Sequence, residues 1–290
     1  MRQQRSTTGT STILLLAFIA IGLLLLILLF TCNTQRTNTT TATTASTTTA
    51  RVSLPTFSPS DIGLPEVTPS ADIIRHSAYT LSYNQPHKQP QWVAYLQTAQ
   101  HTQTATQVRA DRFTPDPLAN FATATDEDYE RQGFDRGHMA PAEDMAWSKL
   151  TMQESFYFTN ISPQLPAFNR GVWRRLENLL RYWSEAYDSV YIVTGPVLTA
   201  GLPFIGINKV SVPRLFYKVV MQYNRKGAKV IGFVLPNEAS AATLQNFAVT
   251  VDSVERLTGI NFFHKLPDDV EEKLESTVNV TEWLWKKVRD

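Results

Sequence analysis

One short stretch of the sequence, FDRGHMAP at residues 134–141, gathers several residue types that can do chemistry. His138 is one of only five histidines, and an imidazole with an ordinary pKa of ~6.5 can accept a proton from water near neutral pH. Arg136 carries a forked cation that suits a phosphate group. Gly137 allows a close backbone approach or a positive φ, while Asp135 can fix a turn or accept a hydrogen bond. The stretch reads as neither helix nor strand, and by itself it is equally consistent with a surface loop.

Three polar residues farther along the chain give the histidine something to act with. Asn169 opens a predicted amphipathic helix, where an asparagine is most often an N-cap. Its amide oxygen would equally suit Mg²⁺, which retains most of its waters and needs few protein ligands. At about 100° per residue, Glu177 and Arg181 lie on the same broad helix face as Asn169. A Glu177–Arg181 pair could organise water around a metal, and an ordinary surface ion pair is the alternative.

These motifs occur in an order that resembles a known enzyme family. DRGH at residues 135–138 is followed by NISPQ, then by NRGVWxxLE, and then by VTGP. This order resembles that of the DNA/RNA non-specific endonucleases, and the resemblance runs from about Ile73 to Leu266. It includes RADRFxxDP upstream and LPDD near the end. Four ordered motifs at compatible spacings are a far more specific signal than any one of them.

The resemblance implies a role for each matching residue. His138 matches the general base that activates water for attack on phosphorus. Asn169 matches the single protein ligand of a catalytic Mg²⁺, for which Mn²⁺ is a substitute. Arg136 matches the arginine of the motif. The other implied residues hold the hydrated metal or the scissile phosphate, and they are Asn160, Glu177 and Arg181, with Arg109 preferred over Arg112 as the upstream phosphate-contacting arginine.

The resemblance also implies the reaction. The protein would hydrolyse phosphodiester bonds of DNA and RNA, leaving 5′-phosphate ends, and contacts with phosphates rather than base edges would make it indifferent to sequence. A homodimer is one arrangement that the resemblance allows. The alternative is a non-catalytic nucleic-acid-binding module on a decayed nuclease fold. Decay would show first at His138 or Asn169, and both are present.

Apolar patterns predict the elements that must position these residues. Short strand-like runs occur at 79–83, 92–96, 155–161 and 190–194. Two longer runs at 215–223 and 229–235 flank the turn 224–227 and predict an antiparallel hairpin. Apolar residues at helical spacing predict helices over 169–187 and over 249–258, the second ending at Gly259. The polar segment 99–128 reads as a long surface loop.

This mixture of strands and helices predicts one α+β domain with a mainly antiparallel central sheet flanked by helices. The resemblance sharpens the expectation to a ββα-metal nuclease fold, preceded by an N-terminal transmembrane helix. In such a fold a hairpin carries the base, and the helix that follows carries the metal ligand.

The N-terminal composition predicts a membrane anchor. Residues 13–30 contain no charged or strongly polar side chain, which is close to the ~20 residues of a membrane-spanning helix. Arg2 and Arg5 precede this run, so the positive-inside rule places residues 1–12 in the cytoplasm. We therefore expect a single-pass anchor over residues 13–31, with the nuclease domain facing the periplasm or the extracellular space. A cleaved signal peptide and a lipid-modified Cys32 are the alternatives.

A threonine-rich tract over residues 32–60 separates the anchor from the domain, which spans 61–290, and predicts a flexible tether. Cys32 is the only cysteine, so an intramolecular disulfide and a thiolate metal cluster are both excluded. Four of the 27 basic residues lie before residue 61, leaving 23 against 26 acidic residues in the domain, a net charge of −3. Any polyanion must therefore meet a local basic patch rather than a globally positive surface.

Overall fold

The computed structural model describes residues 63–224 and 227–285. The predicted cytoplasmic segment 1–12, anchor 13–31 and tether 32–60 lie outside this range. Within it, no helix combines the length and the apolar character needed to cross a membrane.

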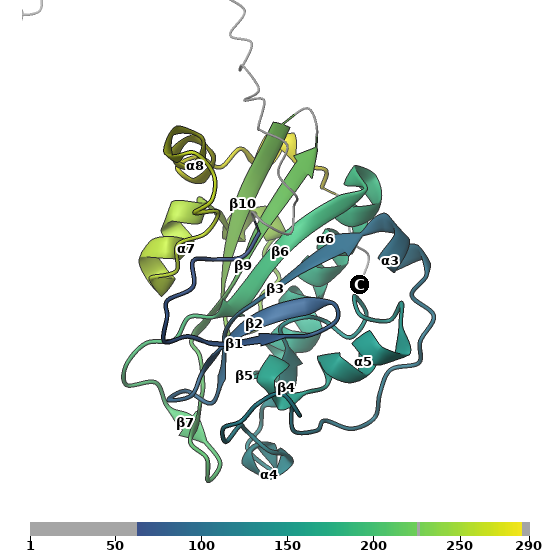
Figure 1. Ribbon diagram of the computed structural model, residues 1–290, viewed down its shortest axis with the longest axis vertical. Coiled ribbons are helices and arrows are strands. Elements are labelled where there is room, and N and C mark those ends of the chain that lie inside the picture. The colour runs from purple at the N-terminus through teal and green to yellow at the C-terminus, as the bar shows by residue number, and fades with distance from the viewer. Residues whose placement is uncertain (1–62, 225–226, 286–290) are drawn as a thin grey trace, which may run out of the picture. The chain divides into compact units, whose positions relative to one another are not determined.

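The centre of the domain is a seven-stranded sheet in which every neighbouring pair of strands is antiparallel (Figure 1). The strand order is β1-β2-β3-β6-β9-β10-β11. The strands are β1 Asp72–Arg75, β2 Tyr79–Asn84, β3 Gln89–Thr98, β6 Ser189–Pro196, β9 Leu215–Asn224, β10 Gly227–Pro236 and β11 Ala248–Val249. The mainly antiparallel sheet expected from the sequence is therefore confirmed.

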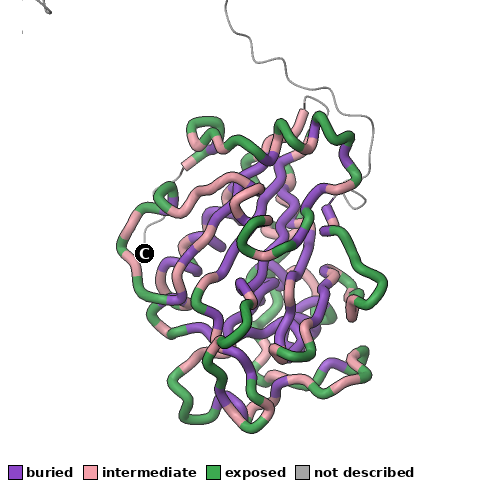
Figure 2. Tube along the Cα trace, turned by 90° about the vertical axis from the view of Figure 1, so that its left-hand side faces the viewer, coloured by how far each residue is buried: buried purple, intermediate pink, exposed green. Residues whose placement is uncertain are grey.

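Side chains that alternate along β9 and β10 divide the interior into two layers. The two strands pair along their whole length, so the predicted hairpin forms. Phe216 and Val220 enter the apolar core on one face of the sheet, whereas Tyr217 and Val219 enter the core on the other. This period of two follows from the pleat of a strand. Figure 2 shows that the strands are largely buried, while exposed segments lie mostly in the connections around them.

Helices cover both faces of the sheet. Helix α6 (Arg174–Tyr187) packs its apolar stripe into the first core, and α7 (Val251–Thr258) and α8 (Asp268–Glu275) pack into the second, beside β9 and β10 in Figure 1. The helix predicted to end at Gly259 is α7. Gly259 has a left-handed φ of 68°, the usual conformation of a glycine just beyond a helix.

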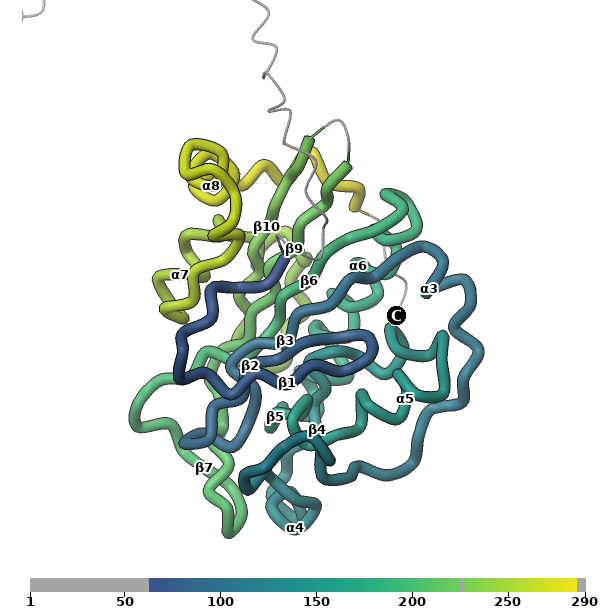
Figure 3. The backbone as a smooth tube through the Cα atoms, in the orientation of Figure 1, coloured from purple at the N-terminus to yellow at the C-terminus, as the bar shows by residue number. Residues whose placement is uncertain are grey.

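Smaller elements complete the domain, and Figure 3 follows the chain from β3 through α3 and past α5 to α4. A two-stranded ribbon joins β4 (Asp135–His138) to β5 (Ile161–Gln164). A second ribbon joins β7 (Phe204–Ile205) to β8 (Val210–Ser211). The short helices are α3 Ala99–Gln103, α4 Asp126–Tyr129 and α5 Lys149–Ser155, with 3-10 turns at Phe158–Asn160, Leu244–Phe247 and Val280–Glu282.

Three local predictions are wrong. The DRGH stretch is strand β4 rather than a loop, because it pairs with β5 far along the chain. The expected strand over 155–161 is instead the end of α5, a 3-10 turn and the start of β5. A short apolar run cannot distinguish a buried strand from a buried helical turn, which explains this error. The supposed loop 99–128 contains α3 and most of α4.

The helix predicted to begin at Asn169 begins later. Residues Phe168–Trp173 form a wide π-type turn that is interrupted at Gly171, where φ is −105° and ψ is −112°. Regular α6 starts at Arg174. Asn169 is therefore not an N-cap, and an even angular count from Asn169 to Glu177 does not hold across the interruption.

Candidate active site

His138 ends strand β4, and its ring is enclosed by aromatic side chains. Ring centroids lie 5.3 Å from Phe113 and 4.8 Å from Phe156. The residue is only 8% exposed, and its Nε2 makes no hydrogen bond within the described structure. Burial, together with the positive charge of Arg109, lowers the pKa of His138 to about 3. The imidazole is therefore neutral at pH 7 and keeps a nitrogen that can accept a proton.

Gly137 allows β5 to approach the strand that carries His138. A Cβ at this position would lie 2.2 Å from Oε1 of Gln164, a fully buried side chain. Two non-bonded heavy atoms cannot share that distance, so a larger residue would push the ribbon apart. The glycine of the motif thus serves close approach, and its φ is not positive.

Asn160 holds the chain immediately after His138. Its Oδ1 accepts a hydrogen bond from the Ala140 amide at 2.9 Å, and its Nδ2 donates to the carbonyls of Ala140 at 2.9 Å and Ser155 at 2.8 Å. The side chain is fully buried. These contacts make Asn160 a positioning residue for the segment that carries the base. Its implied part in holding a hydrated metal stays a prediction that these contacts do not support.

Asn169 is tied to the same strand as the histidine. Its Nδ2 donates to Oδ2 of Asp135 at 2.9 Å, and Arg170 adds two bonds to that carboxylate, at 2.9 and 2.6 Å. Burial works to raise the pKa of Asp135, but the hydrogen bonds from Arg170 and Asn169 outweigh it and hold the pKa below its ordinary value. Asp135, the first residue of the DRGH motif, is thus hydrogen-bonded to the predicted metal ligand Asn169.

The amide of Asn169 fits the Mg²⁺ that the resemblance implies. Because Nδ2 is committed to Asp135, the orientation of the amide is set, and Oδ1 makes no hydrogen bond to any described residue. A neutral, hard oxygen on a half-buried side chain suits an ion that retains most of its waters.

Arg181 reaches a partner other than the predicted one. Its NH1 group donates to Oδ1 of Asp144 at 2.6 Å, and its NH2 group donates to Oδ1 of Asn178. Asp144 is 1% exposed and also accepts a hydrogen bond from the Tyr95 hydroxyl at 2.9 Å. Among the described residues Glu177 makes no salt bridge, so the expected Glu177–Arg181 pair is wrong. The reason is that Asp144, in the loop after β4, reaches the guanidinium instead.

Glu177 instead shares a buried environment with Lys218 of β9. Both side chains are nearly inaccessible, and Nζ of Lys218 donates to Oγ1 of Thr194 at 3.2 Å and lies 4.3 Å from the Trp173 ring centre. Burial raises the pKa of Glu177, and the Lys218 charge opposes this rise. Burial likewise lowers the pKa of Lys218, and the Glu177 charge opposes it.

Neither Asp144 nor Lys218 was predicted from the sequence to belong to the site. A signal existed for the lysine, which interrupts an otherwise apolar strand in LFYKVVM. A charged side chain at an inward position of a central strand is unusual unless it has a partner. Asp144 follows the DRGH motif beside Glu143 in the mostly apolar stretch MAPAEDMAW, where neither of the two adjacent acids stands out as the functional one.

Arg109 lies next to the base. The centre of its guanidinium is 5.1 Å from the Phe156 ring, which also contacts His138, and its side chain is 53% exposed. Its NH1 group lies 3.5 Å from the Glu143 carboxylate, which is also exposed. Arg112 is exposed and makes no contact of this kind among the described residues. The geometry therefore agrees with the preference for Arg109, whose contact with phosphate stays a prediction.

Arg136 is already engaged within the protein. Its Nε lies 2.7 Å from Oδ1 of Asp126, close enough for an ion pair although the angle is not that of a hydrogen bond. Its guanidinium also lies 5.5 Å from the Phe113 ring centre and 5.6 Å from that of Tyr129. A substrate phosphate would have to compete with Asp126 for this arginine, so its direct role stays a prediction.

The arrangement as a whole can bind an anion beside a proton acceptor. The neutral imidazole of His138 lies on the β4–β5 ribbon, and the exposed Arg109 lies beside it in the segment between α3 and α4. The amide oxygen of Asn169 lies in the turn before α6 and is held to the same strand as the imidazole. Four further ionisable side chains lie on the adjoining elements. Glu177 and Arg181 are on α6, Lys218 is on β9, and Asp144 is in the loop after β4.

The family model for DNA/RNA non-specific endonucleases matches residues 63–269. The chain is 35% identical over 220 residues to the mitochondrial nuclease EXOG of Danio rerio, an alignment that covers 70% of this chain and 64% of that protein. It is 35% identical over 214 residues to Nuclease C1 of Cunninghamella echinulata var. echinulata, covering 67% and 84% of the two chains. Bovine mitochondrial endonuclease G is 31% identical over 214 residues, covering 69% and 71%.

A solved structure shows the same likeness in three dimensions. One chain in the crystal structure of an EndoG/EndoGI complex superposes with a TM-score of 0.65 and 32% identity, over 71% of this chain and 90% of that chain. The chain spans slightly less than two thirds of the Danio rerio relative and more of the other two relatives.

Proposed function

The chain belongs to the DNA/RNA non-specific endonuclease family, and from that premise we propose that it is a membrane-tethered endonuclease acting on both DNA and RNA. Its relatives are named nucleases, so the enzyme class is that of a nuclease. The proposal adds hydrolysis of phosphodiester bonds with Mg²⁺, a histidine general base and 5′-phosphate products. The observation that carries it is the neutral, enclosed imidazole of His138, whose Nε2 has no hydrogen-bond partner among the described residues.

His138 takes the proton of the attacking water. Phe113 and Phe156 fix the ring plane and exclude bulk water from its faces. The low pKa of the ring keeps it unprotonated at neutral pH, and part of this lowering comes from the Arg109 charge. A substrate phosphate that pairs with Arg109 offsets that charge, so the proton affinity of the imidazole rises when substrate arrives.

Contacts with the phosphodiester come from arginine. Arg109 is the exposed cation beside His138 and draws the phosphate toward the base. A contact with the phosphate rather than with base edges carries no sequence information, which fits cleavage without sequence preference. Arg136 packs against Phe113 and so helps to hold one wall of the imidazole enclosure.

Asn169 would hold a Mg²⁺ ion through Oδ1, with Mn²⁺ as a substitute. When bound, the ion neutralises charge on the phosphate and stabilises the leaving oxygen. Asp135 keeps the amide in the orientation this requires, and it is itself held by Arg170. Glu177 and Arg181 lie on α6, which continues from the Asn169 turn, and they add further polar side chains to the site.

Activity assays on the purified full chain test this function. With Mg²⁺ present, the chain should degrade plasmid DNA and RNA and leave 5′-phosphates that a kinase can label only after phosphatase treatment. His138→Ala should lower the rate by about 10²–10⁴-fold, the usual contribution of a general base. Asn169→Ala should also lower it, and added Mn²⁺ should not restore the wild-type rate.

His264→Ala is the matched control, because His264 lies in the segment between α7 and α8, which packs against the opposite face of the sheet. It should keep wild-type activity. Full activity in a clean His138→Ala preparation would overturn the assignment of the base. Nucleic-acid binding without any cleavage by the wild type would favour the non-catalytic module.

The tether is proposed from the sequence alone. An apolar run at 13–30 preceded by Arg2 and Arg5, followed by a threonine-rich tract, supports a single-pass anchor with the nuclease domain outside the cytoplasm.

A further inference from the structure

We propose that a second divalent-cation site, selective for Ca²⁺, lies between α7 and α8. Asp252 and Glu255 of α7 converge with Glu275, the last residue of α8, and one carboxylate oxygen from each lies within 4.8 Å of the others. This site is separate from Asn169, because α7 and α8 pack into the core on the opposite face of the sheet from α6.

The environment of Glu275 is the strongest indication of a bound cation. The residue is only 4% exposed, and its buried Oε1 has no hydrogen-bond partner in the part of the chain that the structure describes. A buried carboxylate oxygen that has lost its water and gained no partner is costly. The Glu275 carboxylate belongs to the converging set, so a cation bound jointly with Asp252 and Glu255 would give this carboxylate a partner.

The surroundings favour a cation of more than one charge. The three carboxylates border an open pocket of about 470 Å³. Further acids line it, and they are Asp268, Glu271 and Glu272. None of these six carboxylates takes part in a salt bridge within the part of the chain that the structure describes. Arg256 also borders the pocket, but it is exposed and its NH2 group donates to Oγ of Ser253 at 2.8 Å.

Mutual repulsion among the acids is consistent with this reading. Burial, followed by repulsion from Glu255, Glu271 and Asp252, raises the pKa of Glu275 to about 9. The pKa values of Glu255 and Glu271 are raised as well, in each case chiefly by burial.

The geometry suits Ca²⁺ better than Mg²⁺. Ca²⁺ binds oxygens at about 2.3–2.6 Å, so oxygens on opposite sides of it are about 5 Å apart, and it accepts irregular sets that include bidentate carboxylates. Mg²⁺ requires a tighter and near-octahedral shell. Oε1 of Glu255 already accepts a hydrogen bond from the Phe262 amide at 2.8 Å. This bond restricts the Glu255 carboxylate and makes a regular octahedral coordination shell harder to build.

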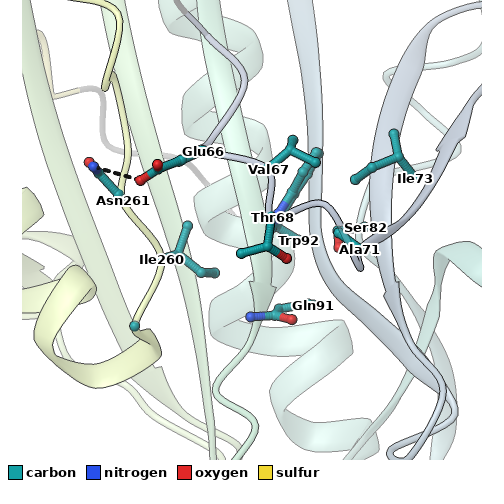
Figure 4. A pocket seen from close by; sticks show the side chains of 11 residues that line it. Glu66, Val67, Thr68, Ala71, Ile73, Ser82, Gln91, Trp92, Ile260 and Asn261 are labelled. Atoms are coloured by element: carbon teal, nitrogen blue, oxygen red, sulfur yellow. Dashed lines mark hydrogen bonds between the residues drawn. The ribbon is translucent and has the colours of Figure 1, made fainter.

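A cation at this position would stabilise the start of the described domain. Glu66, near the start of the described chain, contacts the segment between α7 and α8 (Figure 4). Its backbone amide donates to the carbonyl of Asn261 in that segment at 2.9 Å. Nδ2 of Asn261 donates in turn to Oε2 of Glu66 at 3.1 Å, the dashed line in Figure 4. Asn261 also borders the acidic pocket, so a cation that fixes α7 against α8 would fix this clasp too.

Calcium binding to the full chain tests the proposal. In an Asn169→Ala background, which removes the proposed catalytic ligand, calorimetric titration should still show one saturable Ca²⁺ site. Adding Glu275→Gln should weaken Ca²⁺ binding by at least about tenfold, because a charged ligand is lost. Ca²⁺ should raise the thermal midpoint of the parent and not that of the Glu275→Gln variant. Mg²⁺ at the same concentration should produce a smaller rise.

Asp269→Asn is the matched control, since Asp269 is an exposed acid of α8 outside the cluster. It should leave Ca²⁺ binding unchanged. Asp252→Asn, at a partly exposed position, provides a second test and should weaken binding as Glu275→Gln does. Absence of saturable binding in the Asn169→Ala chain, or equal losses in Asp269→Asn and Glu275→Gln, would overturn the proposal, whatever the nuclease assay shows.

Discussion

His138 owes its chemistry to neighbours that are distant in the sequence. Phe113 comes from the segment before α4, and Phe156 follows α5, yet both rings enclose the imidazole. Arg109 contacts one of these rings and adds its charge. The motif therefore supplies a histidine, and burial keeps its ring neutral. Asn160 shows the same principle, because its full set of hydrogen bonds keeps the backbone after His138 in place.

Acid should destabilise the protein through His138. Its folded-state pKa of about 3 lies below the unfolded value of ~6.5, so between these values the unfolded chain binds more protons. Stability is then lost progressively as the pH falls from about 6.5 toward 3, and at pH 5 the loss from this group is about 2 kcal/mol.

Chemical denaturation at pH 7 and pH 5 measures this effect. His138→Gln, which cannot titrate, should show a smaller loss between the two pH values than the wild type. An identical loss in both proteins would mean that other groups, and not His138, set the acid sensitivity.

At the scale of elements, the β4–β5 ribbon and the turn before α6 bring the site together. The ribbon carries His138, and Asp135 at its other end holds Asn169 in the turn. Arg181 of α6 then reaches back to Asp144, in the loop that follows β4. Two independent contacts thus tie β4 and the loop after it to the turn before α6 and to α6 itself.

Gly137→Ala should open the ribbon. The new Cβ would overlap Oε1 of Gln164, and overpacking of this kind costs about 1–3 kcal/mol. We expect lower stability and a loss of activity, because His138 is the next residue. Gln164→Ala in the same chain removes the overlap and should restore part of both. If the double variant is no better than Gly137→Ala, close approach is not the reason for the glycine.

Asp144→Ala should release α6 from the loop after β4. The change leaves Arg181 without its carboxylate partner and should cost about 3 kcal/mol, the lower end for breaking a buried pair, since Arg181 retains 16% exposure. Urea unfolding provides the measurement. Glu143→Ala, which removes an exposed carboxylate next in sequence, should change stability by less than about 1 kcal/mol. Equal effects of the two variants would contradict a structural role for the Asp144–Arg181 pair.

On the scale of the whole molecule, the antiparallel sheet separates two chemically different regions. The candidate nuclease site lies with α6 and the β4–β5 ribbon, and the acidic pocket lies with α7 and α8. The carboxylates of the acidic pocket therefore lie apart from the candidate nuclease site.

Fractionation of cells that express the full chain tests the tether. The protein should sediment with membranes and resist extraction by high salt, since a spanning helix is held by apolar burial rather than by charge. A chain that begins at residue 61 should be soluble and retain nuclease activity. Protease added outside the cytoplasmic membrane should digest the domain of the full chain. Recovery of the full chain in the soluble fraction would contradict the anchor.

The family, the sheet type and the candidates for the base and the metal ligand could be predicted from the sequence. Ordered motifs and alternating apolar residues are local features, and local features can be read along a chain. The β9–β10 hairpin and the end of α7 at Gly259 were predicted correctly for that reason. That Asp135 of β4 pairs with Gln164 of β5 and that Arg181 pairs with Asp144 became clear only in the folded structure. Strand register, burial and ion-pair choice depend on residues that meet only after folding, and burial is the main cause of the lowered pKa of His138.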